Sequence, residues 1–240
     1  MSYVKYRSVL LFLPALLAAF NASASVVMTG SRVIYPSDAK SVDVQLKNND
    51  EFPYVIQAWF DNGDQDSTPT TGKAPFVATP TTFRIAAKDG QVLRIFAIDK
   101  KGLPQDRESV FYFNFLQIPP SNIGGDKGNQ MVIMLKNRLK VFYRPENLKA
   151  NNKKVFDCLS FSNVTKNNIR ISNASPFYIS LAKVVVKGVA AKDKPQMIAP
   201  FAAADVVLNA GKVTDKNVQG IEISLINDYG AMVTHEYPIQ

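Results

Sequence analysis

Residues that could carry catalysis or bind a metal are scarce in this chain. The single histidine, His235, lies five residues from the C-terminus, and Cys158 is the only cysteine. A Ser-His-Asp triad or a histidine zinc site needs partners for that imidazole, and a thiolate zinc site needs several cysteines. We therefore predict that His235 lies at the surface or between domains. Cys158 sits in the apolar run 155–159 and is predicted to be a buried thiol.

Two further segments resemble ligand-binding loops only loosely. Asp61, Asp64 and Asp66 are spaced somewhat like calcium ligands, but the glycine and the terminal glutamate of a calcium loop are missing, so a solvated turn is predicted. The glycine-rich stretch 124–128 lacks the spacing of a phosphate-binding loop and is predicted to be a hairpin loop. The sequence thus predicts neither an enzyme nor a cofactor.

The chain carries an excess of positive charge, with 28 Lys and Arg against 20 Asp and Glu. Such an excess can indicate a nucleic acid, an anionic membrane surface or an acidic partner. The basic residues are scattered, however, and no aromatic platform of the single-strand-binding kind accompanies them. We therefore predict no nucleic-acid partner, and assign the charge to solubility with local attraction for a carboxylate.

The first 24 residues have the three regions of a secretory signal peptide. Lys5 and Arg7 precede an apolar run at 9–20, and the small residues at 22–24 fit a cleavage site near Ala24. The alternative is a short membrane anchor, but a run of about a dozen residues falls short of the roughly 20 that span a bilayer. An exported protein without stable membrane insertion is predicted. Cleavage would remove two positive charges and lower the net charge from +8 to +6.

The elements that must position any site are predicted to be strands. Apolar residues alternate with polar ones, as in VDVQL at 42–46, and turn clusters rich in Asn, Asp and Gly separate short β-branched runs. This spacing is typical of β-sandwiches. A polar stretch at 146–154 interrupts the pattern, with the break placed near 147–151. The predicted organisation is a signal peptide at 1–24 and two all-β domains at 25–147 and 148–240.

One predicted strand, residues 130–145, is unusually long and apolar on both faces of its first half. Met131, Ile133 and Leu135 point to one side, and Val132 and Met134 to the other. Two interpretations remain open from this pattern. The strand could be central and covered on both faces, or it could place one face in the core and offer the other to a partner through strand addition.

Residues 139–145 read LKVFYRP, which resembles the K-[LV]-F-Y-R-P signature of the periplasmic pilus (fimbrial) assembly chaperones. Four more segments resemble that family in the same order along the chain. They are TGSRVIYP at 29–36, NNDEFPYVIQAWF at 48–60, LPQDRES at 103–109 with the FN and IPP that follow it, and NDYG at 227–230. The short segment 120–130 resembles the short-loop branch of the family.

The resemblance implies two immunoglobulin-like β-sandwich domains in a boomerang arrangement. It also implies a periplasmic chaperone that folds and caps pilus subunits by donor-strand complementation and delivers them to an outer-membrane usher. By motif, Arg32 and Lys140 would hold the subunit's C-terminal carboxylate. The groove-filling residues would be Met131, Ile133 and Leu135. Because side chains alternate along a strand, Val132 and Met134 are then predicted to face the chaperone's own core. An interdomain charge network would contain Glu108, Arg144 and Asp228.

Two other classes of protein remain as alternatives. A structural or adhesive surface protein could use the same pair of sandwiches, but would not need Arg32 and Lys140 together at a cleft. An exported hydrolase would need a histidine constellation, metal ligands or a nucleophile elbow, and the sequence shows none of these.

Overall fold

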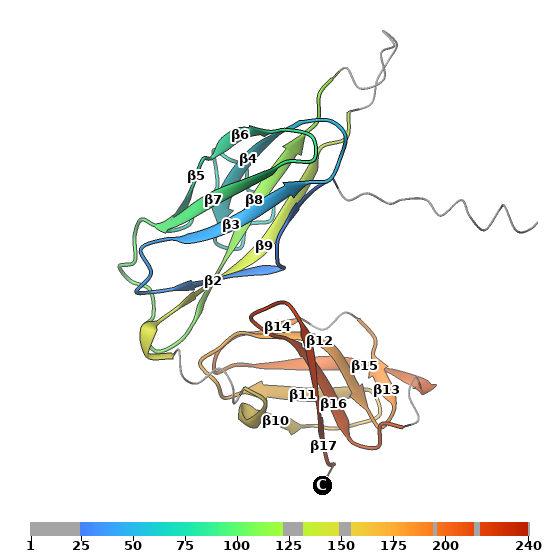
Figure 1. The fold of residues 1–240 in the computed structure, drawn as a ribbon. Coiled ribbons are helices and arrows are strands. Elements are labelled where there is room, and N and C mark those ends of the chain that lie inside the picture. The colour runs from blue at the N-terminus through green and yellow to red at the C-terminus, as the bar shows by residue number, and fades with distance from the viewer. Residues whose placement is uncertain (1–24, 122–131, 149–154, 194–195, 214–216, 240) are drawn as a thin grey trace, which may run out of the picture.

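The computed structural model describes residues 25–121, 132–148, 155–193, 196–213 and 217–239. The predicted signal peptide, the glycine-rich stretch 124–128 and Met131 lie outside these residues. The part of the chain that is described folds into two all-β domains set at an angle to each other (Figure 1). It contains no helix that is long and apolar enough to cross a membrane.

The first domain is a sandwich of two sheets. One sheet has the order β1 (Val26–Met28), β3 (Val42–Asn48), β7 (Gly90–Ala97) and β5 (Phe76–Thr79). The other has the order β2 (Arg32–Pro36), β9 (Leu135–Arg144), β8 (Ser109–Ile118), β4 (Tyr54–Asp61) and β6 (Thr82–Ile85). Alternating side chains from both sheets form one apolar core, in which Leu46, Ile56 and Phe113 are fully buried.

The N-terminal segment changes sheets within a few residues. β1 pairs antiparallel with β3, whereas β2 pairs parallel with β9. Gly30 lies between them with φ of 95°, in the left-handed region that side-chain-bearing residues rarely adopt. This switch brings Arg32 alongside β9, which is the relationship on which the site depends.

The second domain has its own apolar core, in which Ile169, Ile171 and Ile223 are buried. Its sheet order begins with β10 (Leu159–Ser162), β11 (Asn168–Asn173) and β15 (Ala203–Val213). It continues with β13 (Val189–Ala191), β12 (Ile179–Val186), β16 (Ile221–Ile226) and β17 (Met232–Tyr237), and β14 (Met197–Ile198) pairs with β12. The 3-10 turns Glu146–Leu148 and Phe156–Cys158 flank the stretch between the domains.

His235 and Cys158, which were considered first as candidates for catalysis or metal binding, lie in this second domain. His235 is exposed, as predicted, with its ring against Tyr237 at 4.6 Å and Phe156 at 5.4 Å between centroids. Cys158 is only partly buried, so the prediction of a core thiol was wrong. The apolar run around it forms a 3-10 turn rather than a strand, and a turn does not direct alternate side chains into a core.

Candidate functional site: the open edge of β9 and the interdomain cleft

Strand β9 is paired along only part of its length. β8 pairs with it from Leu135 to Tyr143, but β2 covers its other edge only from Lys140 to Arg144. Within the described residues, no strand covers that second edge from Leu135 to Leu139. Because β1 joins the opposite sheet, the N-terminal segment reaches β9 only at Lys140. The backbone groups of an open edge are available to pair with another chain.

The side chains of β9 divide into two faces. Val141 and Tyr143 are buried in the core of the first domain, and Leu139 packs against that core. By alternation Leu135 belongs to the same row, yet it is 50 % exposed. Ile133, just before the strand, is 67 % exposed. This row, which is interrupted by Asn137, therefore carries exposed apolar side chains past the end of the domain's own core.

Two predictions about this segment need correction. Val132 and Met134 were assigned to the core, but they are 46 % and 54 % exposed. The assigned strand also begins at Leu135 rather than near residue 130. Both differences have one cause: β8 stops pairing with β9 at Leu135, so the preceding residues extend beyond the sheet and have no core to face. β9 is a central strand only from Lys140 onward.

Arg32 and Lys140 are opposite each other in the ladder between β2 and β9. The Nη1 of Arg32 donates hydrogen bonds to the carbonyl oxygen of Ile226 at 2.9 Å and to Oγ of Ser180 at 3.3 Å, both in the second domain. Its Nε is buried without a hydrogen-bond partner in the described structure. Lys140 makes neither a hydrogen bond nor an ion pair with any described residue.

Burial is the main influence on the titration of both cations. It lowers the pKa of Arg32, and the charge of Asp228 partly opposes that effect. It also lowers the pKa of Lys140, and the charge of Arg32 lowers it further. Two partly buried cations that repel each other form a favourable site for an anion, since charge-assisted bonds to a carboxylate are stronger than neutral ones.

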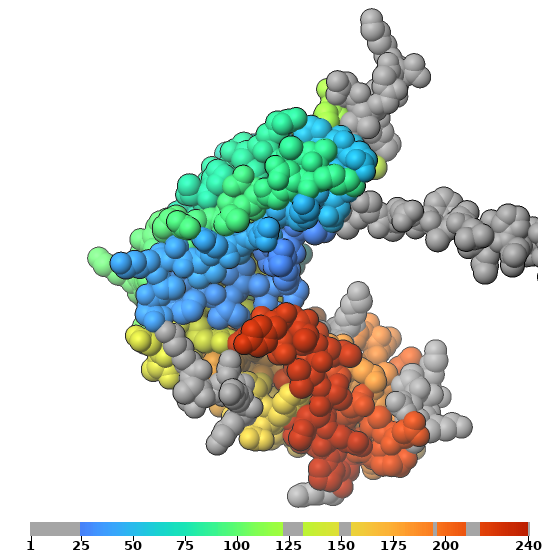
Figure 2. Space-filling model, viewed as in Figure 1, coloured from blue at the N-terminus to red at the C-terminus, as the bar shows by residue number. Residues whose placement is uncertain are grey.

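Arg32 also lines a pocket between the two domains. From the first domain the pocket includes Phe142, whose ring centroid lies 6.0 Å from the guanidinium of Arg32. From the second domain it includes Ile179, Leu225 and Val233. In Figure 2 the two domains meet on one side and leave a hollow on the other. The pocket thus combines apolar walls with charged residues of both signs, since Glu108, Arg144 and Asp228 line it as well.

Glu108, Arg144 and Asp228 come together where the domains meet. Arg144 donates from Nε to Oε1 of Glu108 at 2.7 Å, and from Nη1 and Nη2 to the Asp228 carboxylate at 2.6 and 2.9 Å. Glu108 also accepts a 2.8 Å bond from the backbone N–H of Tyr178. Glu108 and Arg144 are buried. Burial raises the pKa of Glu108, although the charge of Arg144 opposes that rise.

Comparison with known proteins identifies the relatives of this chain. Residues 25–149 match the model of the pili and flagellar-assembly chaperone, PapD N-terminal domain. Residues 154–237 match that of the pili assembly chaperone PapD, C-terminal domain. The chain belongs to the pili assembly chaperone family. This confirms the resemblance noted in the sequence, and it agrees with the prediction that the protein is not an enzyme, since the family consists of chaperones.

Individual relatives agree with that assignment along nearly the whole chain. The chaperone protein HifB of Haemophilus influenzae is 39 % identical over 238 residues, covering 96 % of each chain. The probable fimbrial chaperone YadV of Escherichia coli is 35 % identical, covering 95 % of this chain and 96 % of its own.

Solved structures show the same architecture. The CupB2 chaperone of Pseudomonas aeruginosa is 30 % identical with a TM-score of 0.73, covering 89 % of this chain and all of its own. The SafB chaperone of Salmonella enterica, solved in complex with the SafA pilin, is 25 % identical with a TM-score of 0.76, covering 90 % of this chain and 97 % of its own. The predicted fold of two immunoglobulin-like sandwiches is confirmed.

One feature of the chaperone was missed in the sequence. Asp61, assigned to a solvated turn, is fully buried and forms a bidentate ion pair with Arg138 of β9 at 2.6 and 3.0 Å. Burial alone would raise the pKa of Asp61, but bonds from Arg138 and Asn114 lower it. The signal that could have indicated Arg138 is its alternation with Lys140 on the outer face of β9. Its partner is 77 residues away, so only the fold identifies it.

Proposed function

We propose that this chaperone binds pilus subunits whose fold lacks a strand, and supplies that strand with β9. The observation that carries the proposal is the open edge from Leu135 to Leu139, which follows the exposed Ile133, carries the exposed Leu135 and ends at two cations that form no ion pair with any described residue. Strand addition to such an edge gives affinity through backbone hydrogen bonds and specificity through alternate side chains. SafB, a relative of similar fold, is solved in complex with a pilin.

Arg32 and Lys140 are proposed to hold the C-terminal carboxylate of the subunit. Because β2 begins at Arg32 and runs parallel to β9, a subunit strand that ends at this pair would lie in line with β2 along the same edge. Its preceding residues would then extend toward Leu135. The bound strand would therefore run parallel to β9.

Ile133 and Leu135 are proposed to enter the open groove of the subunit, together with Met131, which lies outside the described residues. Each large apolar side chain that becomes fully buried would contribute roughly 1.5–3 kcal/mol. Val132 and Met134 are exposed as well, and they are available to the partner rather than to the chaperone's core.

The network of Glu108, Arg144 and Asp228 is proposed to set the angle between the domains. Arg144 follows Lys140 by four residues on the same strand, and Asp228 lies two residues after Ile226, which accepts a bond from Arg32. A change in domain angle would therefore move the second-domain wall of the carboxylate site.

The cellular setting completes the proposal. Residues 1–24 act as a signal peptide that is removed near Ala24, and the mature chain works in the periplasm with domains at 25–147 and 148–240. It delivers its subunits to an outer-membrane usher. The family membership and the pilin bound to SafB support this setting.

Co-purification tests the function directly. The chain, tagged at its C-terminus and expressed in a bacterium that assembles the corresponding pili, should retain pilus subunits from a periplasmic extract, identified by mass spectrometry. The Lys140→Ala variant should lose them. A structural or adhesive surface protein would instead polymerise or bind sugar, and Lys140→Ala would leave both properties unchanged.

A further inference from the structure

The half of β9 that carries Leu135 is held by a strand on one edge only. Such a segment can slip or roll unless other contacts fix it. A slip of one residue would exchange the apolar row for the row that contains Lys136 and Arg138, because side chains alternate between faces. The side chains of that second row make contacts that would oppose such a change.

Arg138 is tied across the sheet. It lies opposite Asn114 of β8, and Asp61 lies opposite Tyr112 on the far side of that strand, so the ion pair of Arg138 and Asp61 crosses β8 diagonally. The guanidinium carbon lies 3.4 Å from the ring centroid of Tyr112. The Asp61 carboxylate also accepts bonds from Asn114 Nδ2, Ser67 Oγ and the Gly63 N–H at 2.7, 3.3 and 2.7 Å.

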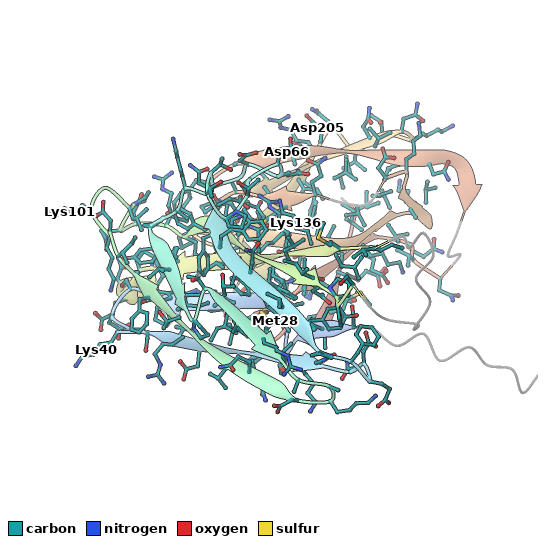
Figure 3. All side chains as sticks on the ribbon, turned by 90° about the horizontal axis from the view of Figure 1, so that it is seen from above. Met28, Lys40, Asp66, Lys101, Lys136 and Asp205 are labelled. Carbon is teal, nitrogen blue, oxygen red and sulfur yellow. The ribbon has the colours of Figure 1, made fainter. Side chains whose placement is uncertain are left out.

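Lys136 ties the same half of β9 to the loop that follows Asp61. Its Nζ donates to the carbonyl oxygens of Gln65 and Ser67 at 2.7 and 2.8 Å. Lys136 and Asp66, the residue between these two acceptors, are labelled in Figure 3. The Lys136 Nζ also lies 5.2 Å from the ring centroid of Trp59, whose Nε1 donates to Ser67 at 3.1 Å. The loop, β4 and β9 are thus joined by one connected set of contacts.

Lys136, Arg138 and Lys140, three cations on the outer face of β9, differ in their contacts. Arg138 is neutralised by Asp61, and the Lys136 ammonium is occupied by two carbonyl oxygens. Only Lys140 makes no such bond in the described part of the chain. An incoming carboxylate therefore meets one available ammonium on this strand, at the point where Arg32 adjoins it.

We propose that Asp61 and Lys136 are positioning residues for subunit capture. Through Arg138 and the 62–72 loop, they hold the open-edged half of β9 so that Ile133 and Leu135 face the subunit groove. This inference rests on the proposed function and deepens it. Contacts of this kind favour binding because the strand is already ordered before the partner arrives.

The test compares Asp61→Asn and Lys136→Met with Asp43→Asn. Asp43 forms an exposed bidentate ion pair with Arg94 elsewhere in the same domain, so it is a control for the loss of such a pair away from β9. Lys136→Met keeps the unbranched stem beside Trp59 and removes only the ammonium, which guards against loss of the fold. Three measurements apply to each variant: thermal melting, amide hydrogen exchange at residues 135–139, and capture of the subunit that co-purifies with the wild-type chain.

Lys136→Met should leave melting unchanged, speed exchange at residues 135–139 about tenfold, and weaken subunit capture about tenfold. Asp61→Asn should also speed exchange at residues 135–139 and weaken subunit capture. Asp43→Asn should change neither exchange nor capture. A tripeptide with the subunit's terminal residues and a free carboxylate reaches only Arg32 and Lys140. Its binding, followed by NMR, should change less than about twofold in Lys136→Met.

Unchanged exchange and unchanged capture in both variants would overturn the positioning role, as would a parallel loss of tripeptide binding in Lys136→Met. A wild-type chain that retains no subunit would instead overturn the proposed function. In that case the exchange measurement on the free chaperone still decides whether Lys136 and Asp61 hold β9.

Discussion

Arg32 and Lys140 face each other as paired residues of the parallel strands β2 and β9, and neither forms an ion pair with a carboxylate in the described structure. Like charges directly opposite in a sheet are destabilising. Partial burial adds to that cost, as the lowered pKa of each residue indicates. A bound carboxylate would relieve both effects at once, so the pair of residues that destabilises the free chaperone is also the proposed binding site.

Removing either cation should abolish efficient subunit capture while leaving the fold intact. A hydrogen bond to a charged group contributes about 1.5–3 kcal/mol, so Arg32→Ala and Lys140→Ala should each weaken capture roughly ten- to a hundredfold. Capture of a denatured subunit during its refolding measures the effect, with circular dichroism as the check on folding. Lys101→Ala, on an exposed loop of the same domain, is the control. Normal capture by both site variants would rule out the anchor.

Carboxylate binding should begin to weaken at a lower pH than it would if the lysine in the site had its ordinary pKa. Burial and Arg32 lower the pKa of Lys140 in the free chaperone below 10.5, and a bound carboxylate raises it by favouring the charged form. The complex thus holds the proton more tightly. Affinity is therefore full below the free-state pKa and falls as the pH rises through it. Titration of a peptide with a free C-terminal carboxylate at increasing pH measures this.

Lys140→Arg is the matched variant for that profile. A guanidinium stays protonated throughout the range, so any binding that remains should be nearly independent of pH. An identical alkaline loss in the variant and the wild type would assign the titration to another group.

Ile133→Asp should weaken subunit capture with little change in the melting temperature. The side chain is 67 % exposed in the free protein, so a carboxylate there remains solvated. In the complex it would enter an apolar groove, where an unpaired charge is costly. Val92→Asp, at a residue 49 % exposed on β7, is the control and should capture normally. A large drop in melting temperature for Ile133→Asp would show that Ile133 belongs to the core.

The sequence predicted the parts of this architecture that depend on local pattern. Alternation identified strands, and it predicted one row for Ile133 and Leu135, both of which are exposed. Alternation does not show where a core ends, however. The end of the core along β9 depends on how far β8 pairs with it, and for this reason Val132 and Met134 were misassigned. The ion pair of Asp61 and Arg138 was missed for a similar reason, since its partners meet only through the pairing of β4, β8 and β9.

Asp228→Asn should loosen the angle between the domains. Arg144 is buried and reaches Asp228 across the domain boundary, so removing that carboxylate leaves the guanidinium with Glu108 alone. Breaking a buried pair costs about 3–5 kcal/mol, and here the cost should be smaller because the Asp228 side chain is 31 % exposed. Small-angle scattering should show a wider spread of dimensions, and subunit capture should fall because Ile226 and Ser180 no longer stay beside Arg32.

Asp205→Asn removes an exposed ion pair with Arg170 in the same domain and should change neither measurement. If Asp228→Asn gave the scattering curve and the capture of the wild type, the network would not be what sets the domain angle.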